Sequence, residues 1–215
     1  MAEPDILWPT PQGIYYSVTD PSETPQKRLI RDLLLQSGQG PVRYDREGLS
    51  PLLEGAEGGA KLLEQLIRSS WLQLLEEPPE IPSKPYEELL KELLAPLGDR
   101  RVLLLEEEGF YLASKGFPHE IAEHLAALGA DLLRVYEHHR DLLEPMLKVG
   151  TQAWSLVDAA GLSRLGFWPI YLDGRRFGLV VEGVPMLNHP NFVLLVWQLL
   201  LRYSQSGQGG VTPGG

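Results

Sequence analysis

The chain has 215 residues, 43% of them hydrophobic, and contains no cysteine. It is long enough for one large domain or two smaller ones, and disulfides, thiolate nucleophiles and thiolate zinc sites are excluded. With 19 Lys and Arg against 29 Asp and Glu, its formal net charge of -10 disfavours nucleic acid as a main partner.

The sequence shows neither a cationic, apolar leader nor a stretch of the roughly 18 to 20 apolar residues that a membrane-spanning helix needs. Together with the lack of cysteine, this predicts a cytoplasmic protein with no membrane partner.

Residues 1–25 hold prolines at a density that disfavours a long helix. We therefore expect an extended, proline-rich arm with one short strand at residues 13–18. Three aromatic residues are expected to hold this arm against the rest of the protein: Trp8, Tyr15 and Tyr16.

Residues 26–77 are expected to form a small helical module. Apolar residues recur at helical spacing in 26–35, 46–53 and 60–70, and an extended apolar segment follows at 71–75. This order is winged-helix-like. The third helix offers Lys61, Gln65 and Arg68 for contact with bases, which is little for DNA recognition, so a helical cap without a nucleic-acid role is favoured.

A proline-rich linker at residues 78–83 separates this module from a second domain, predicted to span 84–206. Its first helix is expected to begin behind Ser83 as the N-cap. An apolar run at 102–105, an acidic turn ending at Gly109 and a second run at 110–113 then predict a hairpin. The tip at residues 106–108 is expected to be a solvated turn.

A long helix follows Pro118, and it carries two stripes. The larger apolar residues recur at Ile121, Leu125, Leu128, Leu132 and Val135. The second stripe is formed by small residues, which permit close approach of another helix or a sheet: Ala122, Ala126, Gly129 and Ala130. An irregular last turn is expected at 141–147.

The C-terminal part predicts three strands, at residues 151–157, 167–172 and 175–181, with Asp173-Gly174 as a two-residue turn. A final helix beginning near Pro190 has apolar residues around nearly its whole circumference and should be buried on more than one side. The glycine-rich tail at 207–215 is expected to be disordered.

The order of helix, two-strand hairpin, long helix, three-strand meander and helix resembles the roadblock / dynein light chain family. The residues that carry the resemblance are the hairpin sequence LLLEEEGFYLASKG at 103–116, the alanine-rich helix at 121–133 and Leu187-Asn188 before the last helix. The predicted fold class is therefore α+β: a roadblock-like five-stranded antiparallel sheet with helices (α-ββ-α-βββ-α), plus the small N-terminal module.

The resemblance implies a non-enzymatic adaptor that forms homodimers by pairing the long helices and joining the sheets at their edges. It also implies a platform for a small Ras-like GTPase or a larger cytoplasmic assembly. On this basis the expected dimer interface comprises the small-residue stripe and one aromatic residue of the expected edge strand: Ala122, Ala126, Gly129, Ala130 and Trp154. Two alternatives are a transcription regulator using the N-terminal module, and a hydrolase or ligand-sensing domain.

The candidate chemical motifs are weak. His119 and His124 are five residues apart, which puts their side chains about 140° apart on a helix, so they cannot share one metal ion. His138 and His139 are attributed to a solvated helix end. The serines and glycines lack the contexts of nucleophile elbows and phosphate-binding loops. No catalytic, cofactor or metal site is predicted.

Overall fold

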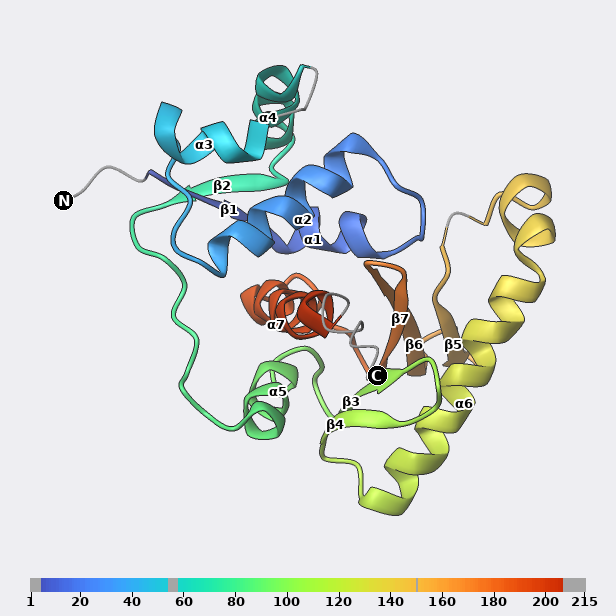
Figure 1. The fold of residues 1–215 in the computed structure, drawn as a ribbon. Coiled ribbons are helices and arrows are strands. Elements are labelled where there is room, and N and C mark those ends of the chain that lie inside the picture. Colours follow the sequence, from blue (N-terminus) through green and yellow to red (C-terminus); the bar gives the residue numbers. More distant parts are fainter. Residues whose placement is uncertain (1–4, 54–57, 150, 207–215) are drawn as a thin grey trace, which may run out of the picture. The chain divides into compact units, whose positions relative to one another are not determined.

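The computed structural model describes residues 5–53, 58–149 and 151–206 (Figure 1). Its contacts divide the chain into two compact units. The first comprises Met1–Ser17, Glu23–Ile81 and Val193–Gly215, and the second comprises Val18–Ser22 and Pro82–Phe192. The tail expected to be disordered lies outside the described residues.

The N-terminal segment differs from the predicted arm. It forms strand β1 (Ile6–Pro9) and helix α1 (Pro11–Val18), so the strand expected at 13–18 is wrong. Pro11 is the first residue of α1, where its missing N–H is not needed, and the Thr10 hydroxyl accepts a hydrogen bond from the Gly13 amide. Pro11 therefore marks the start of a helix and not an extended segment.

The helices predicted for the rest of the first unit are confirmed as α2 (Pro25–Ser37), α3 (Arg46–Leu53) and α4 (Gly59–Arg68). Strand β2 (Leu72–Leu75) follows and pairs antiparallel with β1, from Ile6 opposite Leu75 to Pro9 opposite Leu72. The partner of β2 thus comes from the N-terminus of the chain. The winged-helix-like character of this module stays a prediction.

The last helix, α7 (Pro190–Ser206), groups with the first unit from Val193 onward. Trp197 packs edge-on against Trp8, with ring centroids 5.0 Å apart. The buried residues of α7 lie around most of its circumference, as its sequence predicts: Phe192, Val193, Leu195, Val196, Trp197, Leu199 and Leu200. The second unit ends at Phe192. The domain limit at residue 206 stays a prediction.

The second unit begins with α5 (Tyr86–Leu94) and the hairpin of β3 (Val102–Glu106) and β4 (Tyr111–Lys115). The N-cap of α5 is Pro85 and makes no side-chain capping bond, so the expected Ser83 cap is wrong. In the hairpin turn Gly109 has φ +92°, a conformation that glycine adopts without strain. Helix α6 (His119–His138) follows, and a π-helical turn, η1 (Leu142–Met146), forms the irregular end that was expected.

Three further strands complete the sheet: β5 (Trp154–Val157), β6 (Ser163–Leu172) and β7 (Arg175–Glu182). All pairs are antiparallel, and the strand order is β4-β3-β7-β6-β5. Asp173 and Gly174 both have positive φ in the tight turn between β6 and β7. The α+β class, the five-stranded antiparallel sheet and the α-ββ-α-βββ-α order are confirmed.

Candidate interaction surface

Helix α6 carries two apolar seams that run side by side along its length. One follows the residues at 122, 126, 129, 133 and 136, and the other those at 121, 125, 128, 132 and 135. Both repeat with the alternating four- and three-residue spacing of a heptad pattern, offset by one residue or about 100°. The seams therefore face different surroundings.

The first seam faces the sheet of its own subunit. Ala122 and Ala126 are 0% exposed and belong to one core cluster with Leu103 and Leu105 of β3. A Cβ atom added at Gly129 would lie 2.5 Å from Cδ2 of Leu105. Small residues are thus needed for α6 to approach the sheet closely.

This placement bears on the predicted dimer interface. Ala122, Ala126, Gly129 and Ala130 are buried within the subunit, so they leave no exposed side-chain surface for a second helix. Small residues permit the close approach of either a helix or a sheet, and here the neighbour is the sheet. Dimerisation and the interface residues expected for it stay predictions.

The second seam is exposed. Ile121, Leu128 and Val135 are 44%, 42% and 43% exposed, at intervals of seven residues. Leu125 and Leu132 between them are half-buried. Large aliphatic side chains at helical spacing and at this exposure form a continuous apolar stripe, which typically marks a contact surface for another protein.

Strand β5 supplies a second exposed apolar element. It forms one edge of the sheet, pairing only with β6 among the described strands, and all four of its residues are exposed. Trp154, predicted for the interface, is 36% exposed, and Leu156 and Val157 are more exposed still. An open strand edge with apolar side chains is a template for pairing with another chain.

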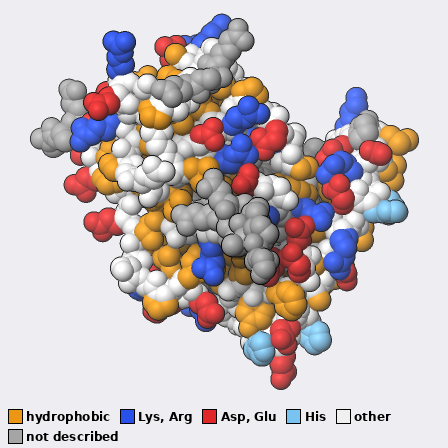
Figure 2. All heavy atoms as spheres, viewed as in Figure 1, with side chains coloured by type: hydrophobic (Ala, Val, Ile, Leu, Met, Phe, Trp, Pro, Cys, Tyr) orange, Lys and Arg blue, Asp and Glu red, His pale blue; other side chains and the backbone are white. Residues whose placement is uncertain are grey.

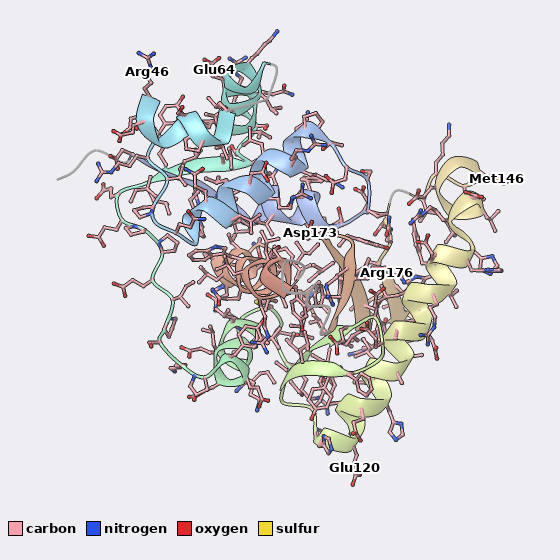
Figure 3. The ribbon with its side chains drawn as sticks, viewed as in Figure 1. Arg46, Glu64, Glu120, Met146, Asp173 and Arg176 are labelled. Atoms are coloured by element: carbon pink, nitrogen blue, oxygen red, sulfur yellow. The ribbon has the colours of Figure 1, made fainter. Side chains whose placement is uncertain are left out.

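The end of α6 is held by a small polar network. The Tyr136 hydroxyl and Nε2 of Gln152 both donate to Oε1 of Glu144, at 2.5 and 3.0 Å. Burial, followed by the hydrogen bond to Glu144, raises the pKa of Tyr136 above its usual value. These bonds tie η1 to α6 and to the segment before β5. In Figure 3, Glu120 and Met146 mark the two ends of this helical region.

The acidic hairpin tip is less solvated than its sequence suggests. Glu107 forms an ion pair with Arg176 of β7, whose Nε lies 2.6 Å from Oε2 of Glu107. Burial, and then the neighbouring Glu108, raises the pKa of Glu106. Glu107 is therefore only partly solvated, because it pairs with a strand residue that is 69 positions away in sequence.

The histidines show ordinary surface contacts. His119 lies 3.5 Å from Glu123 through Nε2, and its Nδ1 lies 2.7 Å from the Tyr111 hydroxyl. The rings of His138 and His139 pack edge to face. Among the described residues, no cluster of three or more His, Cys, Asp or Glu side chains could hold a metal ion.

The surface charge is mixed. Figure 2 shows Lys and Arg side chains scattered among Asp and Glu on the face that it draws. In α4 the basic residues Lys61 and Arg68 alternate with Glu64, which Figure 3 labels. No helix in the described ranges has the length and apolarity to cross a membrane.

Comparisons with known proteins give distant likenesses. No family model matches the sequence, and no curated protein matches it significantly. The solved structure of Myxococcus xanthus MglB is 12% identical, with a TM-score of 0.36 over 57% of this chain and 99% of that one. A gliding protein MglB from Thermus thermophilus is 20% identical, with a TM-score of 0.36 over 60% of this chain and 98% of that one.

A Roadblock/LC7 domain from Streptomyces avermitilis is 16% identical, with a TM-score of 0.31 over 54% of this chain and 95% of that one. Scores this low assign no family. What the structure itself shows is the α-ββ-α-βββ-α order of the elements from α5 to α7 and the five-stranded antiparallel sheet.

Proposed function

We propose that this protein is a non-catalytic adaptor that forms a homodimer through the exposed seam of α6 and the edge strand β5. The observation that carries the proposal is the unbroken apolar stripe formed by Ile121, Leu128 and Val135 on a helix whose other seam is already buried. A helix that is packed on its own sheet has no structural need for a second apolar face.

The dimensions fit a stable contact. A helix of 20 residues is about 30 Å long, and a stripe of that length together with an adjoining strand can supply the roughly 800 Å2 per partner of a standard interface. Self-pairing also explains why the stripe has heptad spacing, because two such helices pack with interdigitated side chains.

The homodimer is proposed to act as a platform for a second protein, a small Ras-like GTPase or a larger cytoplasmic assembly. Support for this part comes from the resemblance of the sequence to the roadblock family. The net charge of -10 and the mixed charges of α4 favour a protein partner over nucleic acid.

The decisive experiment measures the solution mass of the full chain by light scattering after size exclusion. The wild-type protein is expected at twice its monomer mass of 24.0 kDa. Leu128→Arg places a charge in the centre of the exposed seam without touching the core, and it should give folded monomers. Glu123→Arg, an exposed residue of the same helix outside the seam, is the matched control and should remain dimeric.

A monomeric wild-type protein, or an unchanged dimer of Leu128→Arg, would reject pairing through this seam. The platform role is tested separately, by binding of purified dimer to small GTPases loaded with GTP or GDP. If neither the GTP-bound nor the GDP-bound form of any GTPase in a representative set binds, a small GTPase is rejected as the partner. That result would not bear on the proposed dimer.

A further inference from the structure

Polar residues border the exposed seam of α6 on the side away from its own sheet. With Ile121 at 0° and a turn of about 100° per residue, His124 and Asp131 follow directly beside the seam, at about 300° and 280°. On its other side the exposed seam adjoins the buried residues 129 and 136. One flank of the seam is therefore polar and exposed, and the other flank is covered by the subunit's own sheet.

The polar flank carries hydrogen-bonding groups that can serve a second chain. Asp131 has a side chain that is 64% exposed and forms an ion pair with Arg134, one turn further along α6. His124 is also exposed, and it forms no hydrogen bond or ion pair with any residue that the structure describes. A histidine ring donates an N–H in either protonation state, and a carboxylate accepts several hydrogen bonds. His124 and Asp131 are therefore complementary.

The relative direction of two paired α6 helices follows from the flanks that meet, a step that rests on the proposed homodimer. In a parallel pair, the polar flank of one helix meets the covered flank of the other, and the two β5 edges lie on opposite sides. In an antiparallel pair, polar flank meets polar flank and both sheets lie on the same side. Leu132 and Trp154 border one narrow crevice between α6 and β5, so β5 adjoins the covered flank. Only the antiparallel pair therefore lets the edge strands join.

Two antiparallel registers pack seam against seam. In the first register, Ile121 lies opposite Leu132 of the second copy. In the second register, which is shifted by one heptad, Val135 lies opposite Leu125 of the second copy. Both registers match aliphatic residues along the seam, so apolar contacts alone do not choose between them.

The polar flanks distinguish the two registers. The first brings His124 against Asp131 of the second copy, and two-fold symmetry repeats this pair. It also brings Arg134 level with Glu120 of the second copy. The second register brings Asp131 against the same residue of the second copy, and His124 against His138. Because like charges in an interface are costly, the first register is favoured.

We propose that His124 of each subunit donates a hydrogen bond to Asp131 of the other subunit, and that these two reciprocal pairs set the register of the homodimer. The apolar seam supplies the affinity, and the polar flank selects the alignment. His124 and Asp131 are thus positioning residues for self-association.

The first test is the dimer dissociation constant of the full chain, measured by sedimentation equilibrium. His124→Asp sets a carboxylate against Asp131 at both pairs and should raise the constant about tenfold. His139→Asp, the same exchange at an exposed position outside the seam, is the matched control and should leave it unchanged. A tighter His124→Asp dimer would indicate the second register, in which the new carboxylate meets His138, and an unchanged dimer would indicate no pairing. Either result overturns the proposal.

The second test mixes two variants. Asp131→Lys should also weaken its own homodimer. In a heterodimer with His124→Asp, however, the new carboxylate faces the new amine, and the remaining histidine faces the remaining aspartate. Native mass spectrometry should therefore show more heterodimer than random mixing gives. Random proportions would contradict the pairing.

The third test stays decisive if the charge variants fold poorly. The chain contains no cysteine, so single introduced cysteines report the register directly. His124→Cys and Asp131→Cys proteins, oxidised together, should form the mixed disulfide in preference to either disulfide between identical chains. If Asp131→Cys links mainly to itself, the second register is present and the proposal is overturned.

The wild-type mass separates the failure of this inference from the failure of the proposed function. A monomeric wild-type protein rejects the homodimer and the pairing with it. A wild-type dimer that is insensitive to these substitutions rejects the pairing alone.

Discussion

The indole nitrogen of Trp197 donates a hydrogen bond to the backbone carbonyl of Leu34 at 2.8 Å, although the two residues are 163 apart in sequence. Leu34 lies in the last turn of α2, where carbonyls have no partner within the helix. A side chain of α7, the last helix of the chain, therefore caps the C-terminal end of α2, which lies near the beginning of the chain.

Trp197→Phe should lower the free energy of unfolding by about 1 to 2 kcal/mol, because it leaves the carbonyl of Leu34 buried without a donor while keeping a ring against Trp8. Urea denaturation measures the change. Trp197→Ala should cost more, about 3 to 5 kcal/mol, since packing is lost as well. Wild-type stability of the phenylalanine variant would contradict the capping role.

Gly129→Ala should destabilise the protein by about 1 to 3 kcal/mol, although alanine is the better helix former by up to about 1 kcal/mol. The reason is the side chain of Leu105, which is fully buried and lies close to both Gly129 and Gly178, so any shift of it has to be accommodated in a packed core. Thermal unfolding checks the prediction. The double variant Gly129→Ala, Leu105→Val should recover part of the loss, and a failure to recover would show that the clash is not with Leu105.

Glu144→Ala should loosen η1, because the Tyr136 hydroxyl and the Gln152 amide then lose their shared acceptor. Hydrogen exchange should rise at residues 147–149, whose amides bond to carbonyls of this turn, while α5 stays protected. Asp141→Ala is the matched control, since Asp141 precedes the turn and gives no side-chain cap to it. Equal effects of the two variants would argue against the network.

Glu182→Gln tests the contribution of the Arg101–Glu182 pair, in which Nε and Nη2 of Arg101 donate to the two carboxylate oxygens at 2.5 and 2.8 Å. This bond lowers the pKa of Glu182 in the folded protein. A lowered carboxyl pKa stabilises the fold above the unfolded pKa, and this stability is lost as pH falls through the folded pKa.

The difference in stability between wild type and Glu182→Gln should therefore be present at pH 7 and shrink on acidification below about pH 4. Denaturation at a series of pH values measures it. A difference that stays constant across this range would show that the carboxylate charge is not what matters at this position.

Local patterns in the sequence predict most of the secondary structure. The spacing of apolar residues indicates α2, α3, α4 and α6, and the Asp173-Gly174 pair marks the turn between β6 and β7. These features depend on neighbours within a few residues, so periodicity and turn chemistry suffice to find them. The start of α1 at Pro11 was missed because proline favours helix starts as well as extended chain.

The tertiary structure alone decided what each face contacts. The small-residue stripe of α6 permits a close neighbour, and only the packing of Leu105 against Gly129 shows that this neighbour is the subunit's own sheet. The pairing of Glu107 with Arg176 likewise depends on segments distant in sequence. Periodicity reports that a face is apolar, whereas its partner is set by long-range packing, which no local pattern encodes.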